Sequence, residues 1–453
     1  MADALRKADP VGARAVENET NWRRGYLTHF RRAVEAGIGD PAAARAVAAD
    51  GLRSAHQLTR FDDIALDEAI DTVAPSQRLT SRIVDGTAAP ETELTIPYRG
   101  ERLSGRALLD QLDAWVEHGI ITQSCSEAVQ TVQDNPDWLR LDGDTVVVLG
   151  AGAEMGPYRA LLRWGASVVA VDLPRSGIQE RVLEVAADSA GTTRVPQRAE
   201  PDETDTGANL LTELPALAHW LGSLDGRLVL GNYCYADGGT HVRLSMAADA
   251  LGAHLVEQRP DTALAFLATP TDAFATPAAE VERANAAYAR RGPSRMLRTP
   301  MRAISGGRLL QRNYPPGADP GLCDALVPQQ GPNYALAKRL QRWRATTARA
   351  NGTAVSLNVA PATRTRSVVK NKALAAAYAG SHRFGVEIFD PATSNTLMAA
   401  LLAYDLRAGA APQAEPWQDE AVNAAHGGLW TAAYHPRSAL GLAAVLGIGA
   451  LRG

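Results

Sequence analysis

The stretch Asp144–Leu173 constrains the fold of this chain more than any other. Val146–Leu149 is a short β-branched run typical of a buried strand, and the glycine-rich Gly150–Gly156 follows it at once. A short helix is predicted next, and then a second strand, Ser167–Val171, with Asp172 at its carboxyl end. The order of strand, glycine turn, helix, strand and acid predicts a βαβ unit.

This unit suits a dinucleotide. Glycines let the backbone approach a pyrophosphate closely, and the N-terminus of a following helix favours its negative charge. Asp172 lies 22 residues after Gly150, where a carboxylate can accept hydrogen bonds from the ribose hydroxyls of adenosine. A turn that serves packing alone is the competing interpretation. The candidate cofactor-binding residues of the turn are Gly150, Gly152, Glu154, Met155 and Gly156.

Composition and charge limit the classes of partner. The 453 residues exceed the usual size of one domain, and a hydrophobic content of 46% supports a proper core. A net charge of −4 gives no reason to expect nucleic acid or an anionic membrane, and no apolar run reaches membrane-spanning length. Cys125, Cys234 and Cys323 are far apart in the sequence, which favours a reducing, cytoplasmic setting without a metal site. We therefore expect a small-molecule substrate as the partner, and leave a homo-oligomer open.

The predicted elements divide the chain into three regions. Residues 1–140 are predicted to be mostly helical, and residues 376–453 form a mostly helical C-terminal extension. Residues 141–375 alternate strands with helices, which predicts an α/β fold with a doubly wound parallel sheet of the Rossmann type. The later strands of this sheet are predicted at Arg227–Leu230, Thr262–Ala268 and Ala354–Val359.

A second motif lies late in the central region. Tyr334 and Lys338 are four residues apart and share one face of a helix predicted to begin near Pro332. A strand and the segment Pro361–Thr365 follow. In this order of motifs the chain resembles the short-chain dehydrogenase/reductase superfamily over roughly residues 144–375. Only four of the 46 basic residues are Lys, so that a Lys at position 338 is itself informative.

The resemblance implies roles for individual residues. Tyr334 would be the general acid/base, and Lys338 would hold the nicotinamide ribose and lower the pKa of the tyrosine through its charge. Thr365 would contact the nicotinamide amide. The cofactor would be NAD or NADP, with NAD preferred because Asp172 would repel a 2′-phosphate, whereas the neighbouring Arg175 could accommodate one. The other implied cofactor-binding residues are Asn232, Pro361 and Thr363.

Four departures from the family pattern affect the site. Glu154 stands where the family has the middle glycine, and a carboxylate there would repel a pyrophosphate unless it points away or bonds a ribose. Gly231-Asn232-Tyr233 replaces an Asn-Ala-Gly segment, and Ala362 follows Pro361 in place of Gly. The family serine has no obvious counterpart, and its hydroxyl is left open between Thr269 and Thr271.

The segment of sequence before the Tyr334 helix is unusually long for the resembled family. Residues 276–330 form an insertion, which is plausible as a lid or a substrate-binding element beside the site. Its arginines Arg295, Arg298 and Arg302 are candidates to bind a substrate carboxylate or phosphate, and a solvated arginine-rich face is the alternative.

Three functions compete on these grounds. The first is an NAD(P)-dependent oxidoreductase that transfers hydride between nicotinamide and a carbonyl or alcohol substrate. The second is a non-redox enzyme on the same scaffold, such as a dehydratase, lyase or epimerase that keeps the cofactor bound. The third is a non-catalytic nucleotide-binding protein. The sequence favours the first.

Overall fold

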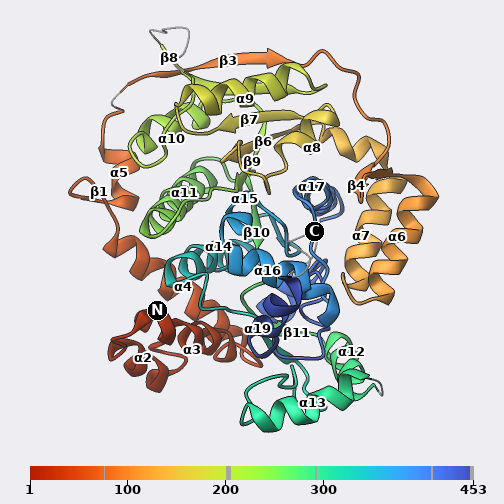
Figure 1. The fold of residues 1–453 in the computed structure, drawn as a ribbon. Helices are drawn as coiled ribbons and strands as arrows, with labels where there is room; N and C mark the ends of the chain where they lie inside the picture. Colours follow the sequence, from red (N-terminus) through yellow and green to blue (C-terminus); the bar gives the residue numbers. More distant parts are fainter. Residues whose placement is uncertain (76, 200–205, 291–292, 410–411, 449–453) are drawn as a thin grey trace.

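A seven-stranded, mostly parallel sheet forms the centre of the protein (Figure 1). The computed structural model describes residues 1–453 except 76, 200–205, 291–292, 410–411 and 449–453. Across the sheet the strands are β13 (Val355–Val359), β10 (Ala263–Ala268), β9 (Arg227–Asn232), β6 (Asp144–Leu149), β7 (Ser167–Val171), β8 (Thr192–Arg198) and β3 (Leu79–Asp85). β3 pairs antiparallel with β8, and the other neighbours pair in parallel. The prediction of an α/β chain built on a parallel sheet is confirmed.

The sheet is buried on both faces. Successive side chains of a strand point to opposite faces, and in β6 Val147 and Leu149 join one buried cluster whereas Val146 and Val148 join another. The first face is covered by α4 (Pro41–Leu58), α5 (Leu66–Thr72), α10 (Leu214–Gly222), α11 (Gly239–Gln258) and α14 (Pro332–Ala350). The second face is covered by α6 (Gly105–Glu117), α7 (Gln123–Asp134), α8 (Tyr158–Arg163), α9 (Ser176–Ala187) and α17 (Pro391–Ala408).

The path of the chain through the sheet reverses at β6. From β6 it moves outward to β7 and β8, and it then returns to the other side of β6 to form β9, β10 and β13. The connections that follow β6 and β9 therefore lead in opposite directions. In open α/β sheets this reversal leaves a crevice at the carboxyl ends of the strands, where ligands bind.

The N-terminal region is joined to this core. β3 completes the edge of the sheet, and α4 packs on α14 through Trp343, whose ring lies against Gly51. Neither β3 nor β8 is predicted by the sequence. The other N-terminal elements are α1 (Ala2–Leu5), α2 (Pro10–Glu17), α3 (Trp22–Glu35), the short pair β1 (Arg60–Phe61) and β2 (Ile64–Ala65), and the hairpin of β4 (Ile96–Tyr98) and β5 (Glu101–Leu103).

The insertion carries structure of its own. It contains α12 (Ala278–Ala289) and α13 (Pro293–Ile304), which lie at the lower end of the view in Figure 1, far from β3 at its top. A small antiparallel pair, β11 (Ala273–Thr276) and β12 (Gly321–Asp324), ties the two ends of the insertion together. The last elements are α15 (Arg366–Lys370), α16 (Lys372–Gly380), α18 (Pro416–Ala421) and α19 (Pro436–Gly447). Within the described ranges, no helix has both the length and the apolar character required to cross a membrane.

Candidate functional site

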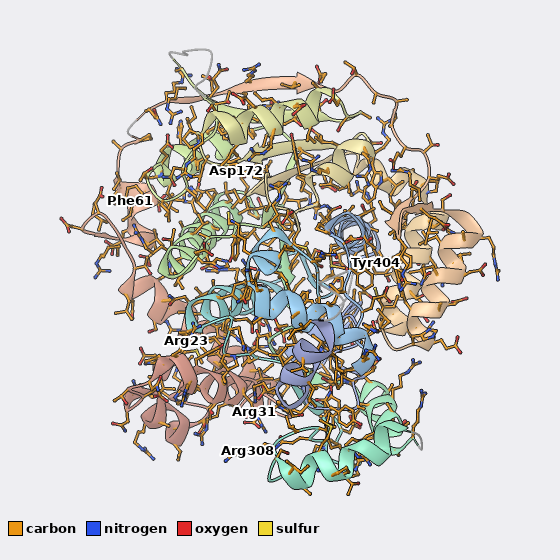
Figure 2. The ribbon with its side chains drawn as sticks, in the orientation of Figure 1. Arg23, Arg31, Phe61, Asp172, Arg308 and Tyr404 are labelled. Carbon is orange, nitrogen blue, oxygen red and sulfur yellow. The ribbon has the colours of Figure 1, made fainter. Side chains whose placement is uncertain are left out.

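A cavity of about 1220 Å³ lies at the carboxyl ends of the central strands. The residues that follow β6, β7, β9, β10 and β13 all contribute to its wall, together with the first two turns of α14 and most of α15. Figure 2 shows Asp172 in the upper half of the view and Arg23 of α3 in the lower half, and both line this cavity. The cavity therefore extends from the glycine turn to the N-terminal helices.

The glycine turn needs its first two glycines. Gly150 has a φ of +85°, and a Cβ there would lie 3.0 Å from the backbone of Cys234. A Cβ on Gly152 would lie 3.1 Å from Oδ2 of Asp172. Gly156 differs, because a Cβ there would meet Tyr233 at an ordinary 3.6 Å, and Gly156 does not line the cavity. The prediction that a ligand approaches the third glycine is therefore not supported by its position.

Asp172 holds the turn against the end of β7. Its Oδ2 accepts a hydrogen bond from the Gly152 amide at 2.8 Å, and its Oδ1 accepts one from the Leu173 amide at 2.8 Å. Each carboxylate oxygen can accept a second hydrogen bond. The residue that the sequence assigns to the ribose hydroxyls thus lies at the cavity wall with acceptor capacity left.

Glu154 turns toward the segment that follows β13. Its carboxylate accepts a hydrogen bond from the backbone amide of Arg366 at 2.8 Å and pairs with the Arg366 guanidinium at 3.2 Å. Asn395 of α17 donates to the backbone carbonyl of Glu154 at 3.2 Å. The charge of Glu154 is therefore compensated by Arg366 within the protein.

Three side chains predicted to be catalytic meet on the other side of the cavity. Pro332 occupies the first turn of α14, where its missing N–H costs nothing. Tyr334 and Lys338 follow one turn apart and both line the cavity. Thr269, the first residue after β10, lines the cavity with them, and its hydroxyl acts to lower the pKa of Tyr334. The Thr271 hydroxyl bonds to that of Thr269 at 2.9 Å and accepts a hydrogen bond from Gln330 at 2.6 Å, and both threonines line the cavity.

Burial shifts the pKa values of both Tyr334 and Lys338. It raises the pKa of Tyr334, while the Thr269 hydroxyl acts in the opposite direction. The net pKa shift of Tyr334 is upward because desolvation of the phenolate dominates, and the lowering expected from the Lys338 charge stays a prediction. Burial also lowers the pKa of Lys338 to about 8. The Lys338 Nζ donates to the carbonyl of Leu267 and to Oε1 of Gln341, each at 3.2 Å.

A buried charge network fixes Thr269 relative to α14. Asp272, three residues after Thr269, pairs with Arg339 and Arg342 at 2.7 Å each, and Nε of Arg342 donates to Glu420 at 2.7 Å. Asp272 and Arg342 are 1% and 2% exposed. Burial alone would raise the pKa of Asp272, but the two guanidinium groups outweigh it and the net shift is downward.

The chain was also compared with known proteins. No protein-family model, curated protein or solved structure matches it.

Several residues of the site are not predicted by the sequence. His241 of α11 is 1% exposed and lies beside Tyr334 with the ring centroids 5.5 Å apart, and Tyr235 contacts both rings. Neither ring nitrogen of His241 has a hydrogen-bond partner of normal geometry among the described residues. Burial and the Lys338 charge lower the pKa of His241 to about 4, so the ring is neutral. Isolated His and Tyr residues carry no motif, and only the fold brings them together.

The remaining predicted residues divide into two groups. Met155, Pro361, Thr363 and Thr365 line the cavity as expected, although the Thr363 hydroxyl is turned to Ser394 at 2.6 Å. Asn232 does not line it: the side chain is 3% exposed, and its Oδ1 accepts a hydrogen bond from the Cys234 amide at 3.3 Å. Asn232 thus fixes the backbone that follows β9 and has no surface in the cavity.

Little of the described insertion reaches the cavity, and its predicted use as a lid or substrate-binding element stays a prediction. Of its described residues, only Gln329 and Gln330 at its end line the cavity. Arg298 donates to the carbonyl of Tyr288 at 2.6 Å, and Arg302 donates to that of Leu310 at 3.1 Å. These arginines hold the insertion together, and the side chain of Arg295 lies outside the described residues.

Proposed function

We propose that the protein is an NAD(P)-dependent oxidoreductase of the short-chain dehydrogenase/reductase type, acting on a small carbonyl or alcohol substrate in this cavity. One observation carries the proposal. Thr269, Tyr334 and Lys338, drawn from two separate parts of the chain, line the same cavity as the glycine turn and Asp172. A packing turn and an unrelated helix-face tyrosine give no reason for this convergence.

The order of the strands supports the same proposal. Across the sheet the parallel strands follow the order β8-β7-β6-β9-β10-β13. When these six strands are numbered along the chain from β6, the order is 3-2-1-4-5-6, as in dinucleotide-binding Rossmann sheets. The cavity also exceeds the roughly 300–1,000 Å³ that is usual for small-molecule pockets. This volume suits a dinucleotide together with a substrate.

The residues present fit a nicotinamide dinucleotide. The turn offers closely approachable backbone at Gly150 and Gly152, Asp172 retains acceptor capacity for ribose hydroxyls, and Glu154 is neutralised by Arg366. Asp172 favours the form without a 2′-phosphate. Arg175 does not line the cavity but Arg181 of α9 does, so Arg181 is the cation that could offset this preference.

Each side chain has a task in the proposed reaction. When bound, the nicotinamide supplies the hydride. Tyr334, kept as a neutral phenol by burial, donates its proton to the substrate oxygen as the carbonyl is reduced. Thr269 accepts or donates a hydrogen bond at the Tyr334 hydroxyl and so holds the phenol in place. The Lys338 ammonium stabilises the phenolate left after proton transfer.

A spectroscopic assay tests this function. Reduced nicotinamide absorbance should fall when NADH or NADPH is mixed with the protein and an active member of a panel of ketones and aldehydes. Binding of NAD(H) in a thermal-shift titration, with no absorbance change across the panel, would favour the non-redox or non-catalytic alternatives. Absence of binding would contradict the cofactor site itself.

Replacing Asp172 should weaken nucleotide binding. Loss of hydrogen bonds to a charged group costs on the order of 1–3 kcal/mol, so Asp172→Ala should raise the Kd for NADH roughly five- to 150-fold by calorimetry. Asp172→Asn serves as the matched control, because its side-chain oxygen can still accept from one of the two backbone amides. Equal, unchanged affinities in both variants would show that the carboxylate does not meet the ribose.

Nucleotide affinity should also depend on pH through Lys338. The lysine is protonated below its lowered pKa of about 8 and loses its charge above it. Ribose contacts made by the ammonium are thus present at pH 6.5 and lost as the pH rises through 8, so the Kd for NADH should increase between pH 7 and 9. Lys338→Met should bind more weakly at pH 7 and show a flat profile over this range. A flat wild-type profile would contradict contact between Lys338 and the nucleotide.

A further inference from the structure

The segment after β13 covers the glycine turn through few contacts. We define the covering segment as Arg364–Lys372, which contains α15. Its contact with the glycine turn is made by Arg366 to Glu154, and at the start of the segment the Arg364 amide donates to the Phe389 carbonyl at 2.9 Å. α15 has no buried residue. Polar contacts at its ends, and not apolar packing, therefore keep this segment in position.

Another anion could replace Glu154 as the ion-pair partner of Arg366 at little cost in stability. The side chains are 81% and 29% exposed, and exposed ion pairs of this kind contribute little stability. Arg366 also lines the cavity, as does Lys370 one turn further on. The guanidinium can therefore meet an anion in the cavity without being moved out of a buried site.

Glu154 occupies the place where an incoming anion would arrive. It lies inside the turn, between Gly152 and Gly156, and its carboxylate already engages both the amide and the guanidinium of Arg366. A pyrophosphate at the turn carries the same kind of charge and offers more acceptor oxygens. The two anions would compete for one cation, and the pyrophosphate would gain a bidentate partner.

We propose that Arg366 is a phosphate-binding residue that pairs with Glu154 while no nucleotide is bound. When a nucleotide binds, its pyrophosphate replaces Glu154 as the partner of Arg366 and keeps the covering segment closed over the glycine turn. This inference rests on the proposed nucleotide site. It accounts for a carboxylate at a position where the turn of the resembled family has glycine. The pyrophosphate replaces the bonds that Glu154 releases, so the segment stays anchored in both states.

Calorimetric titration with ADP-ribose tests the exchange without requiring turnover. Four forms are compared: wild type, Glu154→Gln, Arg366→Gln and the double variant. Glu154→Gln should bind about two- to fivefold more tightly, the size of one exposed charge pair. Arg366→Gln should bind about tenfold more weakly, as expected for a lost charged hydrogen bond. In the Arg366→Gln background, Glu154→Gln should bring no gain, because no guanidinium remains to be released.

Trypsin gives a second measurement on the same proteins. The covering segment holds Arg364, Arg366, Lys370 and Lys372 as cleavage sites. Glu154→Gln should be cut there faster than wild type, and ADP-ribose should restore protection. Glu35→Gln removes a carboxylate that pairs with Arg31 on α3 at 2.8 Å and should behave as wild type.

The outcomes separate the two proposals. If Glu154→Gln improves affinity equally with and without Arg366, Glu154 acts on the pyrophosphate directly, and the exchange is wrong while the nucleotide site stands. If wild type and all variants fail to bind ADP-ribose, the nucleotide site is wrong and the exchange falls with it. Unchanged cleavage in Glu154→Gln would show that the pair does not hold the segment.

Discussion

Tyr334→Phe is expected to lower turnover by about 10²–10⁴-fold, the usual loss when a general acid is removed. The phenylalanine keeps the ring, which packs edge-on against His241 and Tyr235. The change removes only the hydroxyl that we propose as the proton donor. The Kd for NADH should stay within a factor of about two, because the lost group acts only as the chemistry proceeds.

The measurement is the single-turnover rate of NADH oxidation with an active substrate. Tyr288→Phe makes the same change on α12, outside the cavity, and should retain full rate. Thr269→Val should lose less activity than Tyr334→Phe, because the role proposed for Thr269 is to position the phenol and not to transfer the proton. Full activity in Tyr334→Phe would assign the proton to another group and would contradict the role proposed for this tyrosine.

Asp272→Asn is expected to lower the free energy of unfolding by about 3–5 kcal/mol, the cost of removing one charge from a buried ion-pair group. The variant keeps the size of the side chain but leaves Arg339 and Arg342 with Glu420 as the remaining buried carboxylate of the network. The same change loosens the connection after β10 that carries Thr269. Activity should therefore fall even under conditions in which the variant remains folded.

Urea unfolding at neutral pH, followed by circular dichroism, measures this loss. Asp142→Asn is the matched control, because Asp142 pairs with Arg140 at 3.4 Å and its side chain is 75% exposed. Its free energy of unfolding should change by less than about 0.5 kcal/mol. Similar small effects in both variants would show that the buried network contributes little to stability.

The sequence predicts the parts of the fold that depend on local pattern. β6, the glycine turn and β7 combine β-branched runs with a tight turn, and they lie where expected. β8 escapes prediction because Pro196 interrupts its pattern, and a Pro argues against a central strand. The structure tolerates it because Pro196 lies beyond the pairing of β8 with β7, where the Gly207 amide donates to the Pro196 carbonyl at 2.8 Å and no strand needs the missing N–H.

The candidate site is predicted in outline, and the contacts within it are not. The spacing of Tyr334 and Lys338 identifies a helix face, but the choice between Thr269 and Thr271 depends on how the chain bends after β10. The net pKa shift of Tyr334 is likewise beyond the sequence, since it depends on desolvation within the folded cavity. His241 shows the same limit, because its place beside Tyr334 results from packing between α11 and α14.

β3 has a consequence for the way this chain is assembled during synthesis. Asp85 and Thr192 are partners in the sheet although 107 positions separate them. β3 thus leaves the ribosome long before the strand it needs exists, and closing so long a loop carries an entropic cost. Its exposed residues include Thr80, Arg82 and Asp85, and charges on a waiting strand discourage pairing with other chains. β3 can therefore remain unpaired until β8 emerges, and the sheet edge is completed only then.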